Sequence, residues 1–510
     1  MTTKILTSSS IIKHSAISVE VDINNHGLPS FEIVGLGDKT VEESKARVRA
    51  SINNSQFNFP SHHVTVNLTP ADLKKEGSHF DLAISIGILA ASGQININQY
   101  QNWLYFGESN LDGQLTLSKN ILPELLSAIN LGYKDFFIPK IFESEIKQSF
   151  INANIIFAES LSQVCRILIG TEEPLIHINN AKYILNNLSQ SESDLDFKYI
   201  RGQALAKRAL EIAAAGRHNV LFYGPPGTGK TLLSKTFPTI LPDLTEEEAK
   251  EVYSIFIDAG LEQKRKNYFA PPFRSPHHSA SLVGIVGGGP HTKPGELSLA
   301  HKGVLFLDEM AEFPRSILES IRQPIEDQEI LISRSGNKIT FPADFILIGS
   351  TNPCPCGYFK NPLRSCTCSF SQLEKYRKKL SGPILDRIDI FVSVNDLPPS
   401  TIISKTQEEP SSEIKKRIKK SQEFGKRRNN NIATYNSRIS NKNLIEQVNF
   451  VSSDLDFFLN TVDKLNISPR SVCKILKVSR TIADLASSDK VNKNHFSEAL
   501  AFKMNLPTLS

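Results

Sequence analysis

Residues Gly224–Thr231 read GPPGTGKT, the most informative segment of this chain. It follows the apolar run Asn219–Tyr223 (NVLFY) and precedes the helix-forming sequence TLLSKTF. A strand, a glycine-rich loop and a helix in this order present inward-facing backbone N–H groups to phosphate oxygens. We therefore expect the loop to hold the phosphates of ATP. The residues expected to bind the nucleotide are Gly224, Pro225, Pro226, Gly227, Thr228, Gly229, Lys230 and Thr231.

Two residues of the loop and two after a second apolar run predict how the nucleotide is processed. Lys230 is expected to reach the β- and γ-phosphates, and the Thr231 hydroxyl is expected to bind Mg²⁺. The run Gly303–Leu307 (GVLFL) leads into Asp308 and Glu309. The carboxylate of Asp308 would hold the Mg²⁺ shell, and Glu309 would polarise the attacking water. The pattern predicts Mg²⁺-dependent ATP hydrolysis.

Two further side chains are open to more than one interpretation. A third apolar run, Asp344–Gly349 (DFILIG), leads to Asn352, which either senses the γ-phosphate or only occupies the turn before Pro353. Arg387 lies in the apolar sequence ILDRIDI. Its guanidinium either pairs within the fold or reaches the γ-phosphate of a neighbouring subunit. Position in the sequence leaves both roles of Arg387 open.

The sequence pattern divides this α/β chain into four parts. Residues 1–168 mix period-two apolar runs with helical spacing and predict a compact α/β domain. Residues 169–196 are polar and predict a linker. Over residues 197–395, runs that are apolar on both faces alternate with helical segments, which is typical of a parallel sheet covered by helices. Residues 396–510 contain no further apolar β-run and predict a helical domain.

Composition and hydropathy bear on the location and partners of the protein. The 58 basic and 53 acidic residues leave a net charge of +5, which only weakly hints at an anionic partner. The longest apolar stretch, Leu82–Ser92, is about half of the roughly 20 residues that a membrane-spanning helix needs. It predicts a buried core helix. Since no secretory signal is evident, we expect a cytoplasmic protein with no membrane partner.

Four cysteines fall close together, as the pairs Cys354-x-Cys356 and Cys366-x-Cys368. They could furnish a tetrahedral thiolate set for Zn²⁺, although Cys-x-x-Cys pairs are the usual spacing. The alternative is four reduced thiols in a loop. A metal would staple a segment that is too short to form a domain. The segment directly follows Asn352, so the metal would also help to fix the sensor loop, and we predict one structural zinc per chain.

Two basic segments are candidates for contact with nucleic acid. Glu329–Phe341 (EILISRSGNKITF) reads as two strands around a turn at 335–337. Arg334 and Lys338 flank this turn, where they either follow a phosphate backbone or are ordinary surface cations. The basic run Lys415–Arg428 predicts a helix that either carries a solvated charged face or contacts phosphates.

In these ordered blocks the chain resembles the AAA+ family of magnesium-chelatase-like proteins, nearly from end to end. The blocks that carry the resemblance include SFEIVGLGDKTVEESKARVRASI, KPGELSLAHKGVLFLDE, TNPCPCGY and LSGPILDRIDI. The resemblance implies an AAA+ core with a helical C-terminal lid, and a hexameric ring with ATP between subunits. It also implies that Arg387 is a trans-acting finger and that Arg470, in SPRS, is a second sensor.

The same resemblance implies DNA, single-stranded or branched, as the substrate. Family proteins similar to this one act as ATP-driven helicases that migrate DNA branches while incoming DNA is integrated in natural transformation. The N-terminal domain resembles the proteolytic domain of Lon proteases. Ser78, however, lies one place before the expected nucleophile and His79 occupies that place, so we expect no peptidase activity.

Two other functions stay open. A chelatase motor would use ATP hydrolysis to drive metal insertion into a porphyrin by partner subunits. The N-terminal domain and the four cysteines argue against it, because chelatase motors are not expected to carry that pairing. The other alternative is an ATP-switched regulatory or scaffold protein, which would bind nucleotide and assemble without needing turnover.

Overall fold

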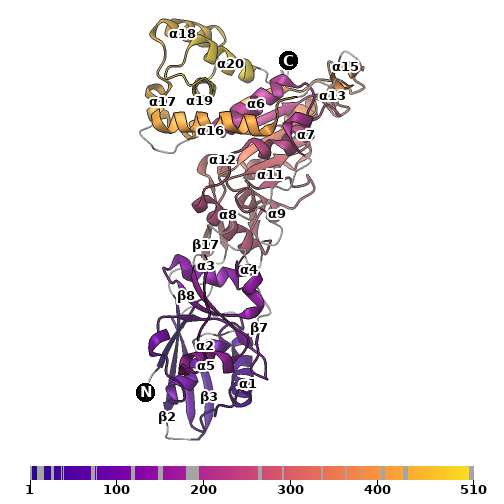
Figure 1. The fold of residues 1–510 in the computed structure, drawn as a ribbon. Coiled ribbons are helices and arrows are strands. Elements are labelled where there is room, and N and C mark those ends of the chain that lie inside the picture. The colour runs from indigo at the N-terminus through magenta and orange to yellow at the C-terminus, as the bar shows by residue number, and fades with distance from the viewer. Residues whose placement is uncertain are drawn as a thin grey trace. The chain divides into compact units, whose positions relative to one another are not determined.

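The computed structural model divides the chain into two compact units, residues 1–190 and 191–510 (Figure 1). It describes residues 3–8, 16–24, 28–35, 37, 39–70, 75, 77–116, 121–147, 153–179, 195–261, 267–289, 292–334, 337–361, 364–380, 382–403, 408–428 and 435–504. No helix within these ranges has the length and apolar character needed to cross a membrane.

The first unit is built on an eight-stranded mixed sheet in the order β10-β9-β8-β5-β1-β2-β4-β3. Its strands are β1 Thr3–Thr7, β2 Ile17–Asn24, β3 Ser30–Val34, β4 His63–Thr69, β5 Leu104–Tyr105, β8 Asp135–Pro139, β9 Ala153–Ala158 and β10 Ile176–Asn179, beside a small pair, β6 Glu108–Ser109 and β7 Leu115–Thr116. Its longer helices are α1 Lys39–Asn54, α2 Asp81–Ala91, α3 Leu122–Asn130 and α5 Leu161–Ile169, and α4 is the single turn Glu143–Lys147.

Helix α2 forms the centre of this unit. Every residue from Asp81 to Leu89 is buried, which confirms the prediction of a core helix at Leu82–Ser92. Asp81 at the start of the helix is fully buried and accepts a hydrogen bond from Nε of Arg47 at 2.7 Å. The pair satisfies a carboxylate that would otherwise be expensive to remove from water.

In the segment compared with Lon proteases, Ser78, Lys75 and His79 contact other groups of the first unit. The Ser78 hydroxyl donates to the carboxylate of Glu108, and the ammonium of Lys75 donates to the carbonyl of Pro70. Nε2 of His79 lies 2.9 Å from the backbone oxygen of Ser8. The absence of peptidase activity stays a prediction.

Part of the predicted linker at residues 169–196 belongs to the first unit. Ile176–Asn179 forms β10, which pairs antiparallel with β9 at the edge of the sheet. The isoleucines at 176 and 178 provide the period-two spacing of a strand, although the surrounding residues are polar. The remainder of the predicted linker, at 180–194, lies outside the described residues.

The second unit contains a five-stranded, fully parallel sheet in the order β12-β15-β18-β11-β19. The strands are β11 Val220–Tyr223, β12 Phe273–Arg274, β15 Val304–Leu307, β18 Ile346–Thr351 and β19 Ile390–Ser393. Helices lie on both faces, so the central strands are buried along their whole length. This explains why their sequences are continuous apolar runs, and it confirms the parallel sheet.

The helices of this core alternate with the strands along the chain, and α6 comes before the first strand. They are α6 Ala204–Gly216, α7 Lys230–Thr236, α8 Glu246–Ala259, α9 Leu282–Val286, α10 Glu296–Leu299, α11 Arg315–Ser320, α12 Arg322–Asp327, α13 Phe370–Lys379 and α14 Gly382–Leu385. The C-terminal helices are α15 Pro399–Ile403, α16 Ser411–Arg428, α17 Asn441–Val448, α18 Leu455–Lys464, α19 Pro469–Leu485 and α20 Lys493–Met504. Helices are thus the regular structure of the described part of 396–510, as predicted.

Ion pairs join the C-terminal helices to the parallel sheet. Nζ of Lys474, in α19, lies 2.6 Å from Oδ1 of Asp389, and Arg438 lies 2.8 Å from Oδ1 of Asp344. Both aspartates stand just before strands of the sheet. Burial raises the pKa of Asp389, but Lys474 and His218 outweigh burial and hold that pKa below its ordinary value. The lid is therefore fastened to the core by charged groups that have little contact with water.

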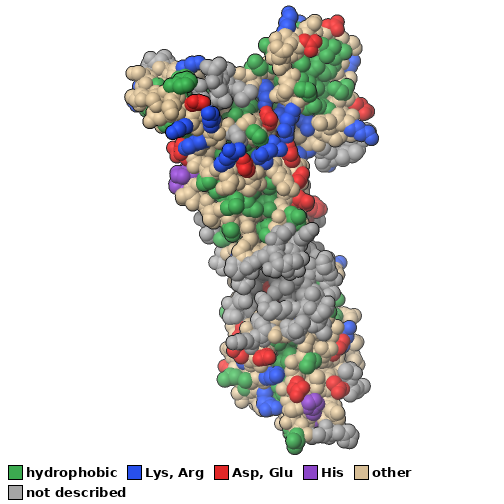
Figure 2. Space-filling view, turned by 180° about the vertical axis from the view of Figure 1, so that it is seen from behind, with side chains coloured by type: hydrophobic (Ala, Val, Ile, Leu, Met, Phe, Trp, Pro, Cys, Tyr) green, Lys and Arg blue, Asp and Glu red, His purple; other side chains and the backbone are tan. Residues whose placement is uncertain are grey.

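The basic run at 415–428 forms α16, as predicted, and several of its cations have acidic partners. Lys415 lies 2.8 Å from Asp243, and Arg417 lies 2.7 Å from Glu211. Four others are exposed on the helix: Lys419, Lys420, Lys426 and Arg427. On the face of this unit seen in Figure 2, Lys and Arg side chains form a band with Asp and Glu side chains among them.

The predicted hairpin at 329–341 is confirmed. β16, Glu329–Arg334, pairs antiparallel with β17, Asn337–Pro342. Asn337 pairs with Arg334, so the connection is two residues long and not the predicted three. The residues of the turn, 335 and 336, and the side chains of Arg334 and Lys338 lie outside what the structure describes.

Candidate nucleotide site

Three neighbouring strands of the parallel sheet deliver the predicted ATP-site residues to one edge. The phosphate loop follows β11, Asp308 follows β15, and Asn352 follows β18. β18 lies between the other two and runs parallel to both. The carboxyl ends of parallel strands meet at the same edge, which is where open α/β sheets bind ligands.

Glycines allow the loop to pass close to its neighbours. Gly224 has φ +156°, and a Cβ at that position would lie 2.0 Å from the backbone oxygen of Val394. Gly227 and Gly229 have φ values of +82° and +91°, in the region that favours glycine. Gln203 braces the outside of the loop, because its Nε2 donates to the backbone oxygen of Thr228 at 3.3 Å.

Lys230 lies inside the loop. Its ammonium donates to the backbone oxygens of Gly224 at 2.8 Å and Pro225 at 2.6 Å, and it reaches Oδ1 of Asn352 at 3.3 Å. Burial lowers the pKa of Lys230 to about 8, although Asp308 and other nearby carboxylates oppose the shift. The ammonium is therefore poorly compensated, and a phosphate group would supply the missing negative charge.

Asp308 is held in place from both of its oxygens. The Thr231 hydroxyl donates to Oδ2 at 2.8 Å, and the Ser350 hydroxyl donates to Oδ1. A hydroxyl and a carboxylate oxygen side by side are ligands that suit Mg²⁺. Thr231 and Asp308 therefore fit a magnesium ion bound together with the phosphates of a nucleotide.

Glu309 follows Asp308 in a left-handed conformation, with φ +50°. Its backbone N–H donates to Oγ of Ser350 at 3.1 Å, which fixes the chain where the strand ends. The side chain is exposed. A carboxylate next to the metal ligand and open to solvent can accept a proton from an attacking water. Strained backbone at such a point is common in catalytic sites.

Arg387 lies at the opposite edge of the same sheet. It precedes β19, and its backbone oxygen accepts a hydrogen bond from Nδ2 of Asn219, which precedes β11. The phosphate loop begins only after β11 ends at Tyr223. Four residues of strand separate the two edges by roughly 13 Å. Arg387 therefore cannot belong to the ATP site of its own chain without a rearrangement of the core.

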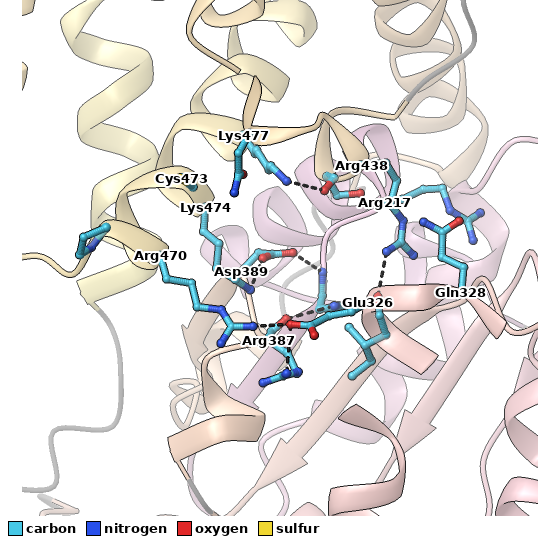
Figure 3. A pocket seen from close by; sticks show the side chains of 15 residues that line it. Arg217, Glu326, Gln328, Arg387, Asp389, Arg438, Arg470, Cys473, Lys474 and Lys477 are labelled. Atoms are coloured by element: carbon cyan, nitrogen blue, oxygen red, sulfur yellow. Dashed lines mark hydrogen bonds and ion pairs between the residues drawn. The ribbon is translucent and has the colours of Figure 1, made fainter. Parts of the chain in front are cut away.

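Arg387 and Arg470 instead line a cleft of about 570 Å³ on that side (Figure 3). Arg470, from the first turn of α19, forms an ion pair with Glu326 of α12. NH2 of Arg387 lies 3.0 Å from the same Glu326 oxygen, and NH1 donates to the backbone oxygen of Pro383 at 2.7 Å. Arg470 is half exposed, whereas Arg387 keeps only 10% of its side chain exposed.

The cleft is strongly basic. Six cationic side chains line it: Arg217, Arg387, Arg438, Arg470, Lys474 and Lys477. Two carboxylates lie among them, those of Glu326 and Asp389. Burial lowers the pKa of Lys477. A surplus of guanidinium and ammonium groups at one place is the chemistry that binds polyphosphate anions.

Sequence reasoning missed two residues of these sites. Ser350, which holds Asp308 and Glu309, stands at the end of the same strand run that predicted Asn352, so its polar side chain there was an available signal. No signal in the sequence points to Glu326, because an acidic residue near a helix end is common and usually solvated. Its pairing with two arginines depends on elements far apart in the chain.

The four clustered cysteines come after β18, at the edge of the sheet that carries the phosphate loop. Their sulfur atoms all lie within 4.8 Å of one another, and the four thiols are free of disulfides. Cys354 is fully buried, and the other three are partly exposed.

Three family models match the chain. They are described as magnesium chelatase, subunit ChlI, over residues 196–402; subunit ChlI of Mg-chelatase, over residues 19–141; and magnesium chelatase, subunit ChlI C-terminal, over residues 408–503. The matches span both units.

Individual relatives agree with these models. Competence protein ComM of Haemophilus influenzae is 40% identical over 489 residues, which cover 96% of this chain and 94% of the relative. Uncharacterized protein YifB of Escherichia coli is 40% identical over 490 residues, again 96% and 94% of the two chains. Lon protease 2 of Bacillus subtilis is 29% identical over 198 residues, 33% of this chain and 34% of the relative.

Proposed function

The chain belongs to the magnesium chelatase family of AAA+ proteins, and we propose that it is an ATP-hydrolysing ring motor that acts on DNA. Its substrate is single-stranded or branched DNA, and its activity is branch migration during the integration of DNA in natural transformation. The Haemophilus influenzae relative is named a competence protein, which supports this role. The observation that carries the motor proposal is the position of Arg387, at the far edge of the sheet from the phosphate loop.

The ATP-binding half of the proposal rests on the cluster around Lys230. Thr231 and Asp308 would hold Mg²⁺, which supplies charge neutralisation at the β- and γ-phosphates. Glu309 would accept the proton of the attacking water, and Asn352 would orient that water or contact the γ-phosphate. Lys230, already hydrogen-bonded to Asn352, links the phosphate to the sensor.

The proposal of a ring follows from the cleft that Arg387 and Arg470 line. An arginine that stabilises the transition state of phosphoryl transfer has to touch the γ-phosphate. Because Arg387 and Arg470 lie at the amino edge of the sheet, they can do so only for the nucleotide of an adjacent subunit. Repetition of that contact around a closed ring gives every site one complete set of groups. We propose a homo-hexamer, as the family resemblance implies.

DNA contact is assigned to two hairpins of the core. β16–β17 carries Arg334 and Lys338 at the strand ends nearest its turn. A second, shorter hairpin, β13 Gly287–Gly288 with β14 Lys293–Pro294, lies beside it, because a Cβ at Gly287 would lie 3.1 Å from Cδ1 of Ile332. Two adjacent hairpins with cationic residues suit a phosphate backbone that passes through a ring.

The deciding experiment measures ATP turnover with and without forked DNA. We expect forked DNA to stimulate the wild type, and Lys338→Ala to lose much of the stimulation while keeping its basal rate. Lys442→Ala removes an exposed lysine of α17 and serves as the matched control that keeps the stimulation. ATP turnover that neither single-stranded nor forked DNA changes, together with no binding of either, would overturn the DNA assignment.

Glu309→Gln separates a motor from the alternatives. A motor loses hydrolysis and DNA remodelling in this variant but still binds ATP, whereas a scaffold that needs only nucleotide binding keeps its function. The family models carry the name of magnesium chelatase, so porphyrin metal insertion with partner subunits is the second assay. Activity there without any response to DNA would favour the chelatase motor.

A further inference from the structure

We propose that Cys354, Cys356, Cys366 and Cys368 bind one Zn²⁺ and that this metal site braces the phosphate loop. Zinc occupancy and ATP binding are then coupled. The inference rests on the proposed ATP site but does not depend on DNA being the substrate.

The spacing of the sulfur atoms fits a single tetrahedral ion. Cys354 Sγ lies 3.3 Å from Cys356 Sγ and 3.7 Å from Cys366 Sγ, and the latter two atoms are 3.5 Å apart. A zinc–sulfur distance near 2.3 Å in a tetrahedron gives an edge of about 3.8 Å between sulfurs. The fourth sulfur, of Cys368, lies within 4.8 Å of the others. As thiolates at these distances, the four groups would repel one another unless a cation lay between them.

The loop around the cysteines is arranged as a thiolate cage. The backbone N–H of Phe359 donates to Cys354 Sγ at 3.3 Å, and the N–H of Cys356 donates to Cys368 Sγ at 3.4 Å. Hydrogen bonds from backbone amides to sulfur stabilise metal thiolates and fix their direction. Soft sulfur ligands select zinc over the magnesium that the ATP site uses. Binding would release the thiol protons to solvent.

The cage touches the phosphate loop directly. Gly357, between the first two and the last two cysteines, has φ +87°, and a Cβ there would lie 2.6 Å from Cδ of Pro226. The Gly357 N–H donates to the backbone oxygen of Cys354 at 3.0 Å, which closes the turn that carries this contact. The cage therefore packs against the outside of the loop that holds the phosphates.

A second connection runs through the sensor segment. Cys354 comes two residues after Asn352, whose side chain contacts Lys230. The hydroxyl of Thr351, the residue before Asn352, lies 3.3 Å from the hydroxyl of Tyr376. Tyr376 belongs to α13, which begins just after Cys368. Both ends of the cysteine segment are thus tied to groups at the ATP site. Metal loss would release both at once.

The first measurement is the metal content of the full chain, purified under reducing conditions without added metal. We expect one zinc per chain and no iron, and cobalt substituted for zinc should show the absorption of a tetrahedral thiolate site. No zinc in the wild type, or iron in its place, would overturn the metal assignment. This result needs no variant and does not depend on any activity.

The second measurement tests the brace. After removal of zinc with a zinc-selective chelator at constant Mg²⁺, the affinity for a fluorescent ATP analogue should fall about fivefold or more and return when zinc is restored. By reciprocity, the same nucleotide should raise the affinity for zinc by the same factor. A chain that holds zinc but binds the analogue equally well without it would overturn the coupling.

Variants localise both effects. Cys366→Ser should lose zinc and show the weak nucleotide binding of the zinc-free chain, whereas Cys473→Ser, at the half-buried cysteine of α19, should change neither. Gly357→Ala should keep zinc and bind nucleotide more weakly, because its Cβ meets Pro226. Gly170→Ala has the same positive φ, +85°, and open space around it, so it controls for backbone strain. Equal nucleotide affinity in the two glycine variants would contradict the contact.

Discussion

Arg387 and Arg470 contact one and the same atom, Oε1 of Glu326. The two arginines come from different elements, one before β19 and one in the first turn of α19 (Figure 3). Both guanidinium groups are thus held by one carboxylate of their own chain.

Subunits should complement each other. Arg387→Gln should bind ATP as the wild type does, because Arg387 is far from its own phosphate loop, but turnover should fall about a thousandfold. Lys230→Ala should lose ATP binding. Mixing the two inactive variants should restore turnover, since the intact loop of one chain meets the intact arginine of the other.

Two observations keep this experiment decisive. Thermal melting of Arg387→Gln should show a folded chain, because glutamine retains a donor toward Pro383. Weak ATP binding by the folded Arg387→Gln chain alone, or no recovery in any mixing ratio, would contradict completion of the site by a neighbour.

Neutralising Glu326 should ease assembly. In the wild type, Arg387 and Arg470 have to leave the carboxylate of Glu326 before they bind the phosphate of a neighbouring subunit. In Glu326→Gln they no longer have an ion pair to give up. Glu326 is 47% exposed, so each ion pair contributes about 0.2–1 kcal/mol. The two pairs together correspond to about 0.4–2 kcal/mol, so the protein concentration at half-maximal turnover should fall by about two- to thirtyfold. Asp327→Asn removes the same charge one residue later and should leave that concentration unchanged; an equal fall in both would point to net charge alone.

ATP affinity should fall as the pH rises above about 8. Burial lowers the pKa of Lys230 to about 8 in the free chain, and only the ammonium form attracts phosphate. Above that pH binding has to take up a proton, so the affinity should drop by up to about tenfold per pH unit. Titrations with the fluorescent analogue between pH 7 and 9.5 measure this.

The matched variant is Lys230→Arg. Its guanidinium stays charged through this range, so its affinity, although weaker, should show no such slope. Calorimetry in buffers of different ionisation enthalpy should detect proton uptake by the wild type at pH 9 and none by Lys230→Arg. Equal slopes in the two proteins would remove Lys230 as the titrating group.

Asp344→Asn should weaken the attachment of the lid. Burial raises the pKa of Asp344, but Arg217, Arg438 and Lys302 outweigh it and hold the pKa below its ordinary value. Loss of the carboxylate leaves buried cations without a partner, which costs about 3 kcal/mol of unfolding free energy at pH 7. Urea denaturation measures this loss.

The pH dependence of that difference has a definite sign. A carboxylate whose pKa is lower in the folded chain stabilises it above the unfolded pKa, near 4, and loses that effect as the pH falls. The gap between wild type and Asp344→Asn should therefore shrink below about pH 4. Asp456→Asn, at an exposed position of α18, should show no gap; a gap independent of pH would exclude the ionised carboxylate as its source.

Much of the fold could be predicted from local pattern. The apolar runs before Gly224, Asp308 and Asn352 are strands, because residues buried on both faces of a parallel sheet have to be apolar at every position. The hairpin at 329–341 was also evident from its alternation and turn. β10 was not, since an edge strand of four residues inside a polar segment leaves little signal.

The residues around Lys230 could be read from the sequence, whereas the contacts of Arg387 and Arg470 could not. The strand, the glycine loop and the helix lie next to one another in the chain, so local geometry predicts the phosphate loop. The polar residues that follow the next strands, Asp308 and Asn352, indicate the chemistry of the site. Which edge of the sheet receives Arg387, that Glu326 joins it to Arg470, and that Gly357 packs on Pro226 depend on contacts between segments far apart in sequence. Such contacts arise only when the core closes, because burial and register, and not local propensity, bring those side chains together.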